Sequence, residues 1–222
     1  MKVLVIGAHG SVGKILVKKL QESQNHSPIA MVRKKDQLEN FKAQGVEAVL
    51  ADLEGSISDI SQAAKDADAI AFTAGSGGST GADKTMFVDL DGTAKAVEAA
   101  KDAGIDRFVI VSALGSQQWL EDPHPDWLDQ LGPYYPAKFY ADQWLKNSGL
   151  DYTIVRPGLL SDDEAEGKVK LAKTLVESGS ITRSDVAQII VDSLDNDDTR
   201  KKEFDVISGD TEIKEALKEL EQ

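Results

Sequence analysis

Short apolar runs alternate with amphipathic segments along the first two thirds of the chain. Six apolar runs bounded by turn residues lie at 2–7, 28–32, 46–50, 68–73, 107–112 and 151–156. Between them, segments with helical periodicity lie near 11–23, 36–43, 57–65, 82–103 and 134–147. Runs of this kind are typical of strands buried on both faces, and their alternation with helices implies right-handed β–α–β crossovers. The pattern predicts an α/β fold, a doubly wound parallel sheet with helices on both faces.

The segment 82–103 has the clearest helical pattern. Its apolar positions recur every three or four residues, at Phe87, Leu90, Ala94, Val97 and Ala100. Gly104 directly follows and is a typical helix stop. We therefore expect one continuous helix whose apolar face, starting at Phe87, packs against the sheet.

The last third of the chain is less regular. It contains an acidic loop at 161–168, a helical segment near 184–194, a strand near 203–208 and a terminal helix near 211–221. Ser184 and Asp185 are the expected N-terminal cap of the helix near 184–194. We predict that residues 1–222 form one domain. Residues 156–222 would be a small C-terminal extension on the substrate side, because ligands of open α/β sheets bind beyond the carboxyl ends of the strands.

The first apolar run ends in three glycines at a spacing of three. Gly7, Gly10 and Gly13 follow the predicted strand and lead into the first helix. Glycines here let the chain turn sharply and bring bare backbone against a diphosphate, while the helix start offers unpaired N–H groups. We expect the diphosphate of a dinucleotide to contact the segment that contains Gly7, His9, Gly10, Ser11, Val12 and Gly13. The alternative is a tight strand–helix turn with no ligand.

Composition narrows the possible partners. The 222 residues have a formal charge of -13 and include no cysteine, and no apolar run approaches the length of a membrane span. So acidic a chain repels nucleic acid and anionic membranes. We expect a cytoplasmic monomer or homodimer that binds a small-molecule substrate, with any anion held by a local set of donors.

The ends of the next three strands are candidates for the rest of the cofactor site. Arg33 follows the second strand, where dinucleotide folds meet the adenosine ribose, and two lysines follow it. A guanidinium there can pair with a 2′-phosphate, so we predict NADP in preference to NAD. The alternative is an exposed basic turn. Asp52 and Leu53 end the third strand, and the small residues 73–78 begin with Thr73, Ala74 and Gly75 beside the expected ribose and diphosphate.

A candidate catalytic set follows the fifth strand. Ser112 ends that strand, and Tyr134 and Lys138 are four residues apart, so a helix places them on one face. A nearby ammonium favours the phenolate form of a tyrosine, which suits proton transfer. Ser112 would orient the substrate oxygen, and Lys138 would also hold the nicotinamide ribose. Tyr135 is a second geometric candidate for the acid/base; we favour Tyr134.

These motifs together resemble the short-chain dehydrogenase/reductase superfamily, in its atypical or extended branch. The resemblance rests on Gly7–Gly13, on Ser112, on Tyr134 with Lys138, and on Arg156-Pro157-Gly158. It implies a Rossmann-type fold, with Pro157 beside the nicotinamide. It also implies an NADP-dependent oxidoreductase acting on a small carbonyl, alcohol or sugar-like compound. The alternatives are a nucleotide-sugar epimerase or dehydratase and a non-catalytic NADP(H) sensor. The segment 88–93 departs from the family pattern, because it has the acidic residues Asp89 and Asp91 where extended members often have asparagine.

Residues 113–133 separate the fifth strand from the tyrosine helix and would cover the expected substrate pocket. Trp119 and Trp127 in this insertion either stack on a planar substrate or pack the loop onto the body of the protein. His124 stands between two prolines and has no partner visible in the sequence. With three scattered histidines and no cysteine, we expect no metal site.

Overall fold

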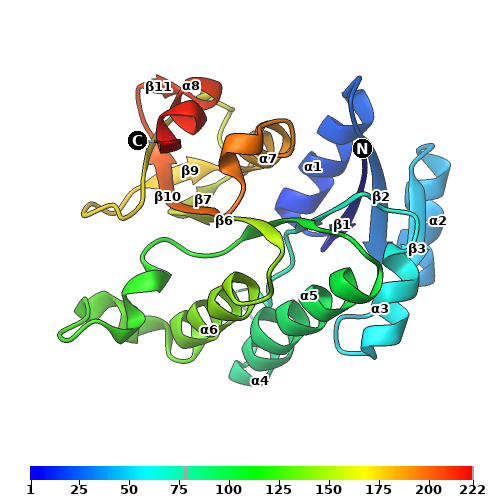
Figure 1. The fold of residues 1–222 in the computed structure, drawn as a ribbon, viewed down its shortest axis with the longest axis horizontal. Helices are drawn as coiled ribbons and strands as arrows, with labels where there is room; N and C mark the ends of the chain where they lie inside the picture. The colour runs from blue at the N-terminus through cyan, green and yellow to red at the C-terminus, as the bar shows by residue number, and fades with distance from the viewer. Residues whose placement is uncertain (78–79, 222) are drawn as a thin grey trace.

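A computed structural model describes residues 1–77 and 80–221 and shows a central sheet between two layers of helices (Figure 1). The strand order is β11-β8-β10-β6-β5-β4-β1-β2-β3. From β3 to β10 the neighbouring strands are parallel, whereas β8 is antiparallel to β10 and β11. The prediction of a Rossmann-like α/β fold is confirmed. Residue 78, the last of the small-residue run after β4, lies outside the described part, as does residue 79.

The strands of the main sheet are β1 (Lys2–Ile6), β2 (Ser27–Val32), β3 (Glu47–Leu50), β4 (Ala69–Phe72), β5 (Arg107–Val111), β6 (Asp151–Pro157), β8 (Lys168–Ala172), β10 (Lys202–Ser208) and β11 (Thr211–Glu212). The sequence predicted the first six of these and β10, but not β8 and β11. A separate two-stranded sheet of β7 (Leu159–Ser161) and β9 (Ser180–Thr182) was also not predicted. These unpredicted strands build much of the C-terminal extension.

Helices cover both faces of the sheet. One layer consists of α1 (Ser11–Glu22), α2 (Lys35–Ala43), α7 (Arg183–Leu194) and α8 (Ile213–Lys218). The other layer contains α3 (Ile57–Ala64), α5 (Gly92–Asp102) and α6 (Tyr134–Lys146). Strand β1 shows how the pleat divides the core, because Val3 and Val5 pack into the first layer while Leu4 and Ile6 pack into the second. Burial on both faces explains the uninterrupted apolar runs.

The segment predicted as one helix at 82–103 has three parts. A single turn, α4 (Ala82–Lys84), leads into a π-helix, η1 (Thr85–Asp91), and then into α5. The wider turns of a π-helix rotate the buried face relative to an α-helix. Phe87 is therefore 51% exposed, contrary to our prediction, and Asp89 is buried in its stead. The later apolar positions Val97 and Ala100 are buried as predicted.

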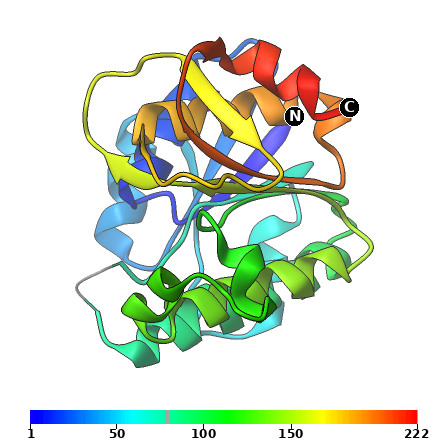
Figure 2. The ribbon, with the colours of Figure 1, turned by 90° about the vertical axis from the view of Figure 1, so that its left-hand side faces the viewer.

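The C-terminal extension lies with the insertion 113–133 at one end of the molecule (Figure 2). The insertion contains two short 3₁₀ helices, η2 (Ser116–Leu120) and η3 (Asp126–Leu131). The predicted cap of the helix near 184–194 was wrong: Thr182 caps α7, accepting a hydrogen bond from the Asp185 backbone N–H. Within residues 1–77 and 80–221, no helix is long and apolar enough to cross a membrane.

Candidate functional site

The three N-terminal glycines build a tight turn for distinct reasons. Gly7 has a φ of +85°, and a Cβ on it would lie 2.6 Å from the backbone nitrogen of Ala74. A Cβ on Gly13 would lie 2.1 Å from the Gly7 carbonyl oxygen, so α1 can pack on β1 only with glycine at this position. Gly10 is exposed and has a φ of −69°. A Cβ on it would meet only the Gly7 carbonyl oxygen, at 3.1 Å. The fold requires Gly10 least, so its missing side chain is the one best explained by a ligand.

The start of α1 leaves its amides open to an anion. Among the described residues, no side chain caps this helix, and its first turn has no carboxylate. Among the described helices, Ser56 caps α3 and Thr182 caps α7, whereas α2, α5 and α6 also have no side-chain cap, so the glycine turn and not the missing cap alone distinguishes α1. Open amides at a glycine turn fit the diphosphate of a dinucleotide. Ser11 is exposed and Val12 is buried, whereas His9 faces a separate hollow of about 480 Å³ between α1 and α2.

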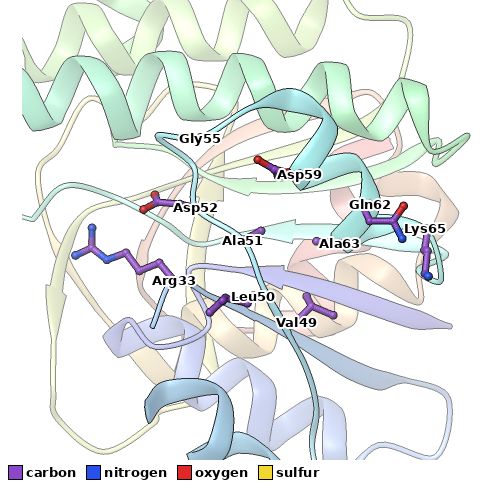
Figure 3. Close-up of a pocket in the computed structure, with 10 residues that line it drawn as sticks. All are labelled: Arg33, Val49, Leu50, Ala51, Asp52, Gly55, Asp59, Gln62, Ala63 and Lys65. Carbon is purple, nitrogen blue, oxygen red and sulfur yellow. The ribbon is translucent and has the colours of Figure 1, made fainter. Parts of the chain in front are cut away.

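Arg33 and Asp52 line one cavity of about 500 Å³ beside β3 and α3 (Figure 3). Both side chains are exposed, and they point to the same side of the cavity. Asp52 also accepts a hydrogen bond from the Glu54 backbone N–H at 3.0 Å. A guanidinium at this position can meet a phosphate on the adenosine ribose. Leu53 is 8% exposed and packs into the core, so at most its backbone could contact the adenine.

The loop after β4 connects the glycine turn to the predicted catalytic helix. The Thr73 hydroxyl donates to the Ile6 carbonyl at 3.0 Å, and Ala74 abuts Gly7. A Cβ on Gly75 would lie 3.3 Å from a carboxylate oxygen of Asp89. Asp89 in turn forms an ion pair with Lys138. An unbroken line of contacts therefore runs from the glycine turn to α6.

Tyr134 and Lys138 lie on the first turns of α6, as predicted. The Lys138 ammonium lies 5.8 Å from the centre of the Tyr134 ring and 3.0 Å from an Asp89 carboxylate oxygen. Burial of Lys138 opposes its charge, but Asp89 and Tyr134 raise its pKa above the ordinary value. Burial, and next Tyr134, raise the pKa of Tyr135 to about 12. Lys138 is therefore placed to act on Tyr134, and burial makes Tyr135 a weaker acid than an ordinary tyrosine.

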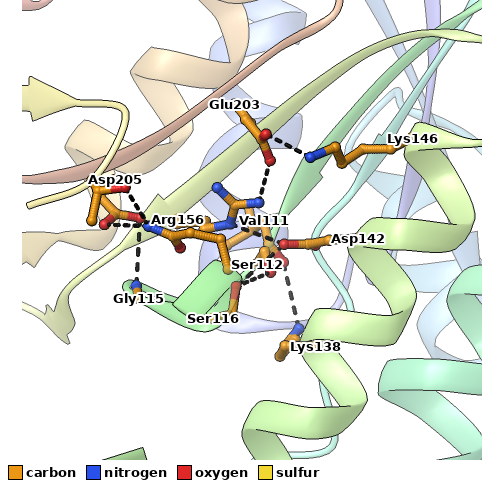
Figure 4. Close-up of polar contacts among 12 residues, drawn as sticks. Val111, Ser112, Gly115, Ser116, Lys138, Asp142, Lys146, Arg156, Glu203 and Asp205 are labelled. Atoms are coloured by element: carbon orange, nitrogen blue, oxygen red, sulfur yellow. Dashed lines mark hydrogen bonds and ion pairs between the residues drawn. The ribbon is translucent and has the colours of Figure 1, made fainter. Parts of the chain in front are cut away.

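Ser112 lies at the end of β5 and is 4% exposed. Its hydroxyl is 3.5 Å from the Ser116 hydroxyl, which donates to Asp142 at 3.2 Å (Figure 4). Asp142 also accepts from the Nε of Arg156 at 2.9 Å. Since the Ser116 proton goes to a carboxylate, Ser116 can only accept from Ser112. At 3.5 Å that bond is weak, so Ser112 can redirect its proton toward a substrate oxygen.

Arg156 is the centre of a buried charge cluster that surrounds Ser112. Its side chain is 0% exposed and bridges Asp142 on α6 and Glu203 on β10. Burial opposes its charge, yet Asp142 and Glu203 raise the pKa of Arg156 above the ordinary value. Lys146 pairs with the other oxygen of Glu203 at 2.6 Å. The Arg-Pro-Gly motif thus anchors α6 to the sheet, and Pro157 follows at the end of β6.

Asp205 holds the insertion against the C-terminal extension. Its buried carboxylate accepts from the Gly115 N–H, the Gln117 amide and the Leu175 N–H, at 3.4, 3.0 and 3.0 Å. Burial raises the pKa of Asp205, although these hydrogen bonds act in the opposite direction. Two segments distant in sequence are therefore fixed together on the expected substrate side.

One aromatic residue of the insertion, Trp127, extends a row of ring contacts that begins at Tyr134. Tyr134 contacts Tyr135 edge to face at 5.4 Å, and Tyr135 contacts Trp127 in the same way at 5.3 Å. Trp119 stacks on His124 at 5.1 Å, away from these three. Trp127 remains 36% exposed. Trp119 therefore packs within the loop, whereas Trp127 both packs on the body and presents part of its ring to solvent.

Several polar residues of the site were not predicted, among them Asp89, Ser116, Asp142, Glu203 and Asp205. Asp142 follows Lys138 by four residues, as Lys138 follows Tyr134, so the helical spacing could have revealed it. Asp89 lies in the π-helix, which the sequence does not predict, and Glu203 could be placed in the site only from the pairing of β10 with β6. Within residues 1–77 and 80–221, no cluster of three histidine or acidic residues could hold a metal ion.

Known proteins resemble the chain over almost its whole length. YhfK of Bacillus subtilis strain 168, described as an uncharacterized sugar epimerase, is 54% identical over 220 residues, which cover 99% of this chain and 100% of YhfK. A solved putative NAD-dependent epimerase/dehydratase of Bacillus halodurans is 42% identical, with a TM-score of 0.88 and 99% of both chains covered. ChuY of Escherichia coli O157:H7, described as an anaerobillin reductase, is 27% identical, with a TM-score of 0.79, covering 96% of this chain and 99% of ChuY.

The match to a family of known proteins agrees with the geometry of the glycine turn. Residues 7–197 match the NAD(P)H-binding family, and this range contains every site residue described above except Glu203 and Asp205. The fold and the structural relatives agree with the atypical short-chain dehydrogenase/reductase branch. The chain therefore belongs to the NAD(P)H-binding family of Rossmann-fold proteins.

Proposed function

We propose that this protein is an NADP(H)-dependent oxidoreductase that acts on a carbonyl or alcohol group of an aromatic or otherwise apolar substrate. The observation that carries this proposal is the contact line from the glycine turn through Ala74, Gly75 and Asp89 to Lys138. It brings an anion-binding turn and an acid/base candidate to one edge of the sheet. ChuY, described as a reductase, supports an oxidoreductase.

The chain offers a partner for each part of the cofactor. Backbone amides at 7–13 would hold the diphosphate, Arg33 the 2′-phosphate and Lys138 the nicotinamide ribose, with Pro157 beside the nicotinamide. When bound, NADPH supplies a hydride. Tyr134 donates a proton to the substrate oxygen, the Lys138 ammonium stabilises the resulting phenolate, and Ser112 donates a hydrogen bond to the same oxygen.

The insertion favours aromatic substrates over nucleotide sugars. Residues 108–137 contain no lysine or arginine, and their four acidic residues, Glu121, Asp122, Asp126 and Asp129, are all exposed. A nucleotide sugar carries a diphosphate that this surface repels. The exposed part of Trp127 can instead stack on a planar neutral or cationic compound. A sugar epimerase activity, as in the description of YhfK, is therefore the second candidate function.

Turnover assays test the function directly. Purified protein is mixed with NADPH and a panel of quinones, aryl ketones and uncharged sugars, and loss of NADPH absorbance is followed with product analysis. We expect net NADPH consumption with aromatic carbonyl compounds. Isomerised product without net consumption would establish an epimerase, and NADPH binding without turnover on any class would establish a sensor.

Arg33→Ala tests the choice of cofactor. We expect the wild type to prefer NADP over NAD, and the variant to lose most of this preference, because the guanidinium no longer pairs with the 2′-phosphate. A charge-assisted hydrogen bond of about 1.5–3 kcal/mol corresponds to a roughly 10- to 150-fold loss of NADP affinity. Calorimetric titration with both nucleotides measures it, with Lys65→Ala as the control from the far side of the same cavity. Equal affinities in the wild type would contradict the assignment.

A further inference from the structure

Asp89 and Lys138 form an ion pair that is almost wholly removed from water. The Lys138 nitrogen lies 3.0 Å from Asp89 Oδ1, and the two side chains are 5% and 0% exposed. Extended members of the family that keep asparagine at this motif would place a neutral amide in this position. The Asp89–Lys138 pair is thus unlike the solvent-exposed ion pairs elsewhere in the chain, such as Lys170 with Glu177.

Few charged groups face Lys138. Asp89 comes from η1, Tyr134 and Asp142 come from α6, and the Val111 carbonyl of β5 lies at 3.5 Å. Burial alone strongly favours the neutral amine, and buried lysines in other proteins titrate several units below their ordinary pKa. Asp142 already pairs with Arg156. Asp89 is therefore the main compensation for the Lys138 charge.

The π-helix and the loop after β4 hold Asp89 in place. The second carboxylate oxygen of Asp89 accepts from the Ser76 backbone N–H at 3.1 Å. The Asp89 carbonyl accepts from the Thr93 hydroxyl at 2.7 Å, at the junction of η1 and α5. These contacts leave the carboxylate little freedom to turn away from Lys138, and they connect it to the predicted cofactor loop.

We propose that Asp89 is a positioning residue that keeps Lys138 protonated and directs its ammonium between Tyr134 and the cofactor loop. The effect on the protonation of Lys138 depends only on the contacts that Asp89 makes. Its catalytic consequence rests on the proposed function: a neutral Lys138 would neither favour the phenolate of Tyr134 nor donate as strongly to a ribose hydroxyl. Without Asp89, these contributions would be lost as the pH rises.

The pH dependence of folding tests the charge state without cofactor or substrate. In the wild type, the pKa of Lys138 lies above its unfolded value, so the stabilisation is complete below about pH 10 and is lost only at higher pH. In Asp89→Asn, burial should place the folded pKa below the unfolded one. The unfolded chain then binds more protons, and the unfolding constant should fall by up to about tenfold per pH unit between these two pKa values.

Urea unfolding from pH 6 to 10 on three proteins separates the outcomes. We expect the ratio of unfolding constants, Asp89→Asn over wild type, to fall steadily with rising pH. In the double variant Asp89→Asn with Lys138→Met, this dependence should disappear. If Asp89→Asn is unfolded at pH 7, we expect it to fold toward pH 10. A ratio that is constant with pH, or a variant that stays unfolded at pH 10 while the double variant folds, would overturn the proposal.

Turnover adds a second measurement. We expect Asp89→Asn to lose NADPH-dependent kcat as the pH rises through the folded-state pKa of Lys138, which is the pH above which the stability of this variant begins to increase. Asp89→Asn combined with Lys138→Arg should lack this loss, because a guanidinium stays charged. An unchanged pH profile in an active Asp89→Asn protein would contradict the proposal. A wild type without turnover would instead refute the proposed function, and the unfolding experiment would still decide the role of Asp89.

Discussion

The Tyr134→Phe variant is expected to lower kcat by about 10²- to 10⁴-fold, the range typical of a lost general acid. The reason is that the phenylalanine ring keeps the contacts with Tyr135 and Lys138 but has no proton to give to the substrate oxygen. NADPH affinity should remain nearly unchanged, since no predicted cofactor contact involves the Tyr134 hydroxyl. Steady-state kinetics and a calorimetric NADPH titration on the same preparation measure both quantities.

Tyr135→Phe is the matched control for this experiment. Tyr135 adjoins Tyr134 and makes the same kind of edge-to-face contact, but burial, followed by Tyr134, raises its pKa to about 12. Its ring packs against Trp127, and phenylalanine preserves that packing. We expect turnover within a few-fold of the wild type. Loss of turnover in Tyr135→Phe with retention in Tyr134→Phe would exchange the roles of the two tyrosines, and activity in both variants would remove tyrosine from the mechanism.

The main sheet was predictable because its strands are buried on both faces. Runs such as Val3–Ile6 and Phe108–Ile110 contain no polar residue, and this local signal does not depend on where the strand lies in the sheet. The strands of the C-terminal extension lack that signal. Strand β8 alternates buried Val169 with exposed lysines, and β7 and β9 are only three residues long. Their existence depends on partners that are distant in the sequence.

The residues of the candidate site likewise fall into a group that the local sequence predicts and a group that it does not. The spacing of Gly7, Gly10 and Gly13, and the spacing of Tyr134 and Lys138, depend on one turn and one helix, so the sequence predicts them. The groups that set the charge of the site come from other elements. Asp89 reaches Lys138 from η1, and Glu203 reaches Arg156 only through the parallel pairing of β10 with β6.

The second large effect concerns stability, and it should appear in Arg156→Leu. Among the described residues, Arg156 is the one cation that forms an ion pair with Asp142, whose side chain is 1% exposed, so leucine leaves that carboxylate buried without its partner. Removing one partner of a buried ion pair costs about 3–5 kcal/mol. We therefore expect the free energy of unfolding at pH 7 to fall by about that amount, a large part of the stability of an ordinary domain. Urea titration followed by circular dichroism measures it.

Arg200→Leu is the control with the same chemical change at the surface. Arg200 pairs with Asp151 and Asp197 at 2.7 and 2.8 Å, but its side chain is 39% exposed, so water screens both pairs. The expected cost is about 1 kcal/mol or less. The difference in the free energy of unfolding between the wild type and Arg156→Leu should also become smaller as the pH is lowered, because protonation neutralises the unpaired Asp142 carboxylate of the variant. Equal costs for the two arginines, independent of pH, would mean that the Arg156 cluster does not hold α6 and Ser112 through its buried charges.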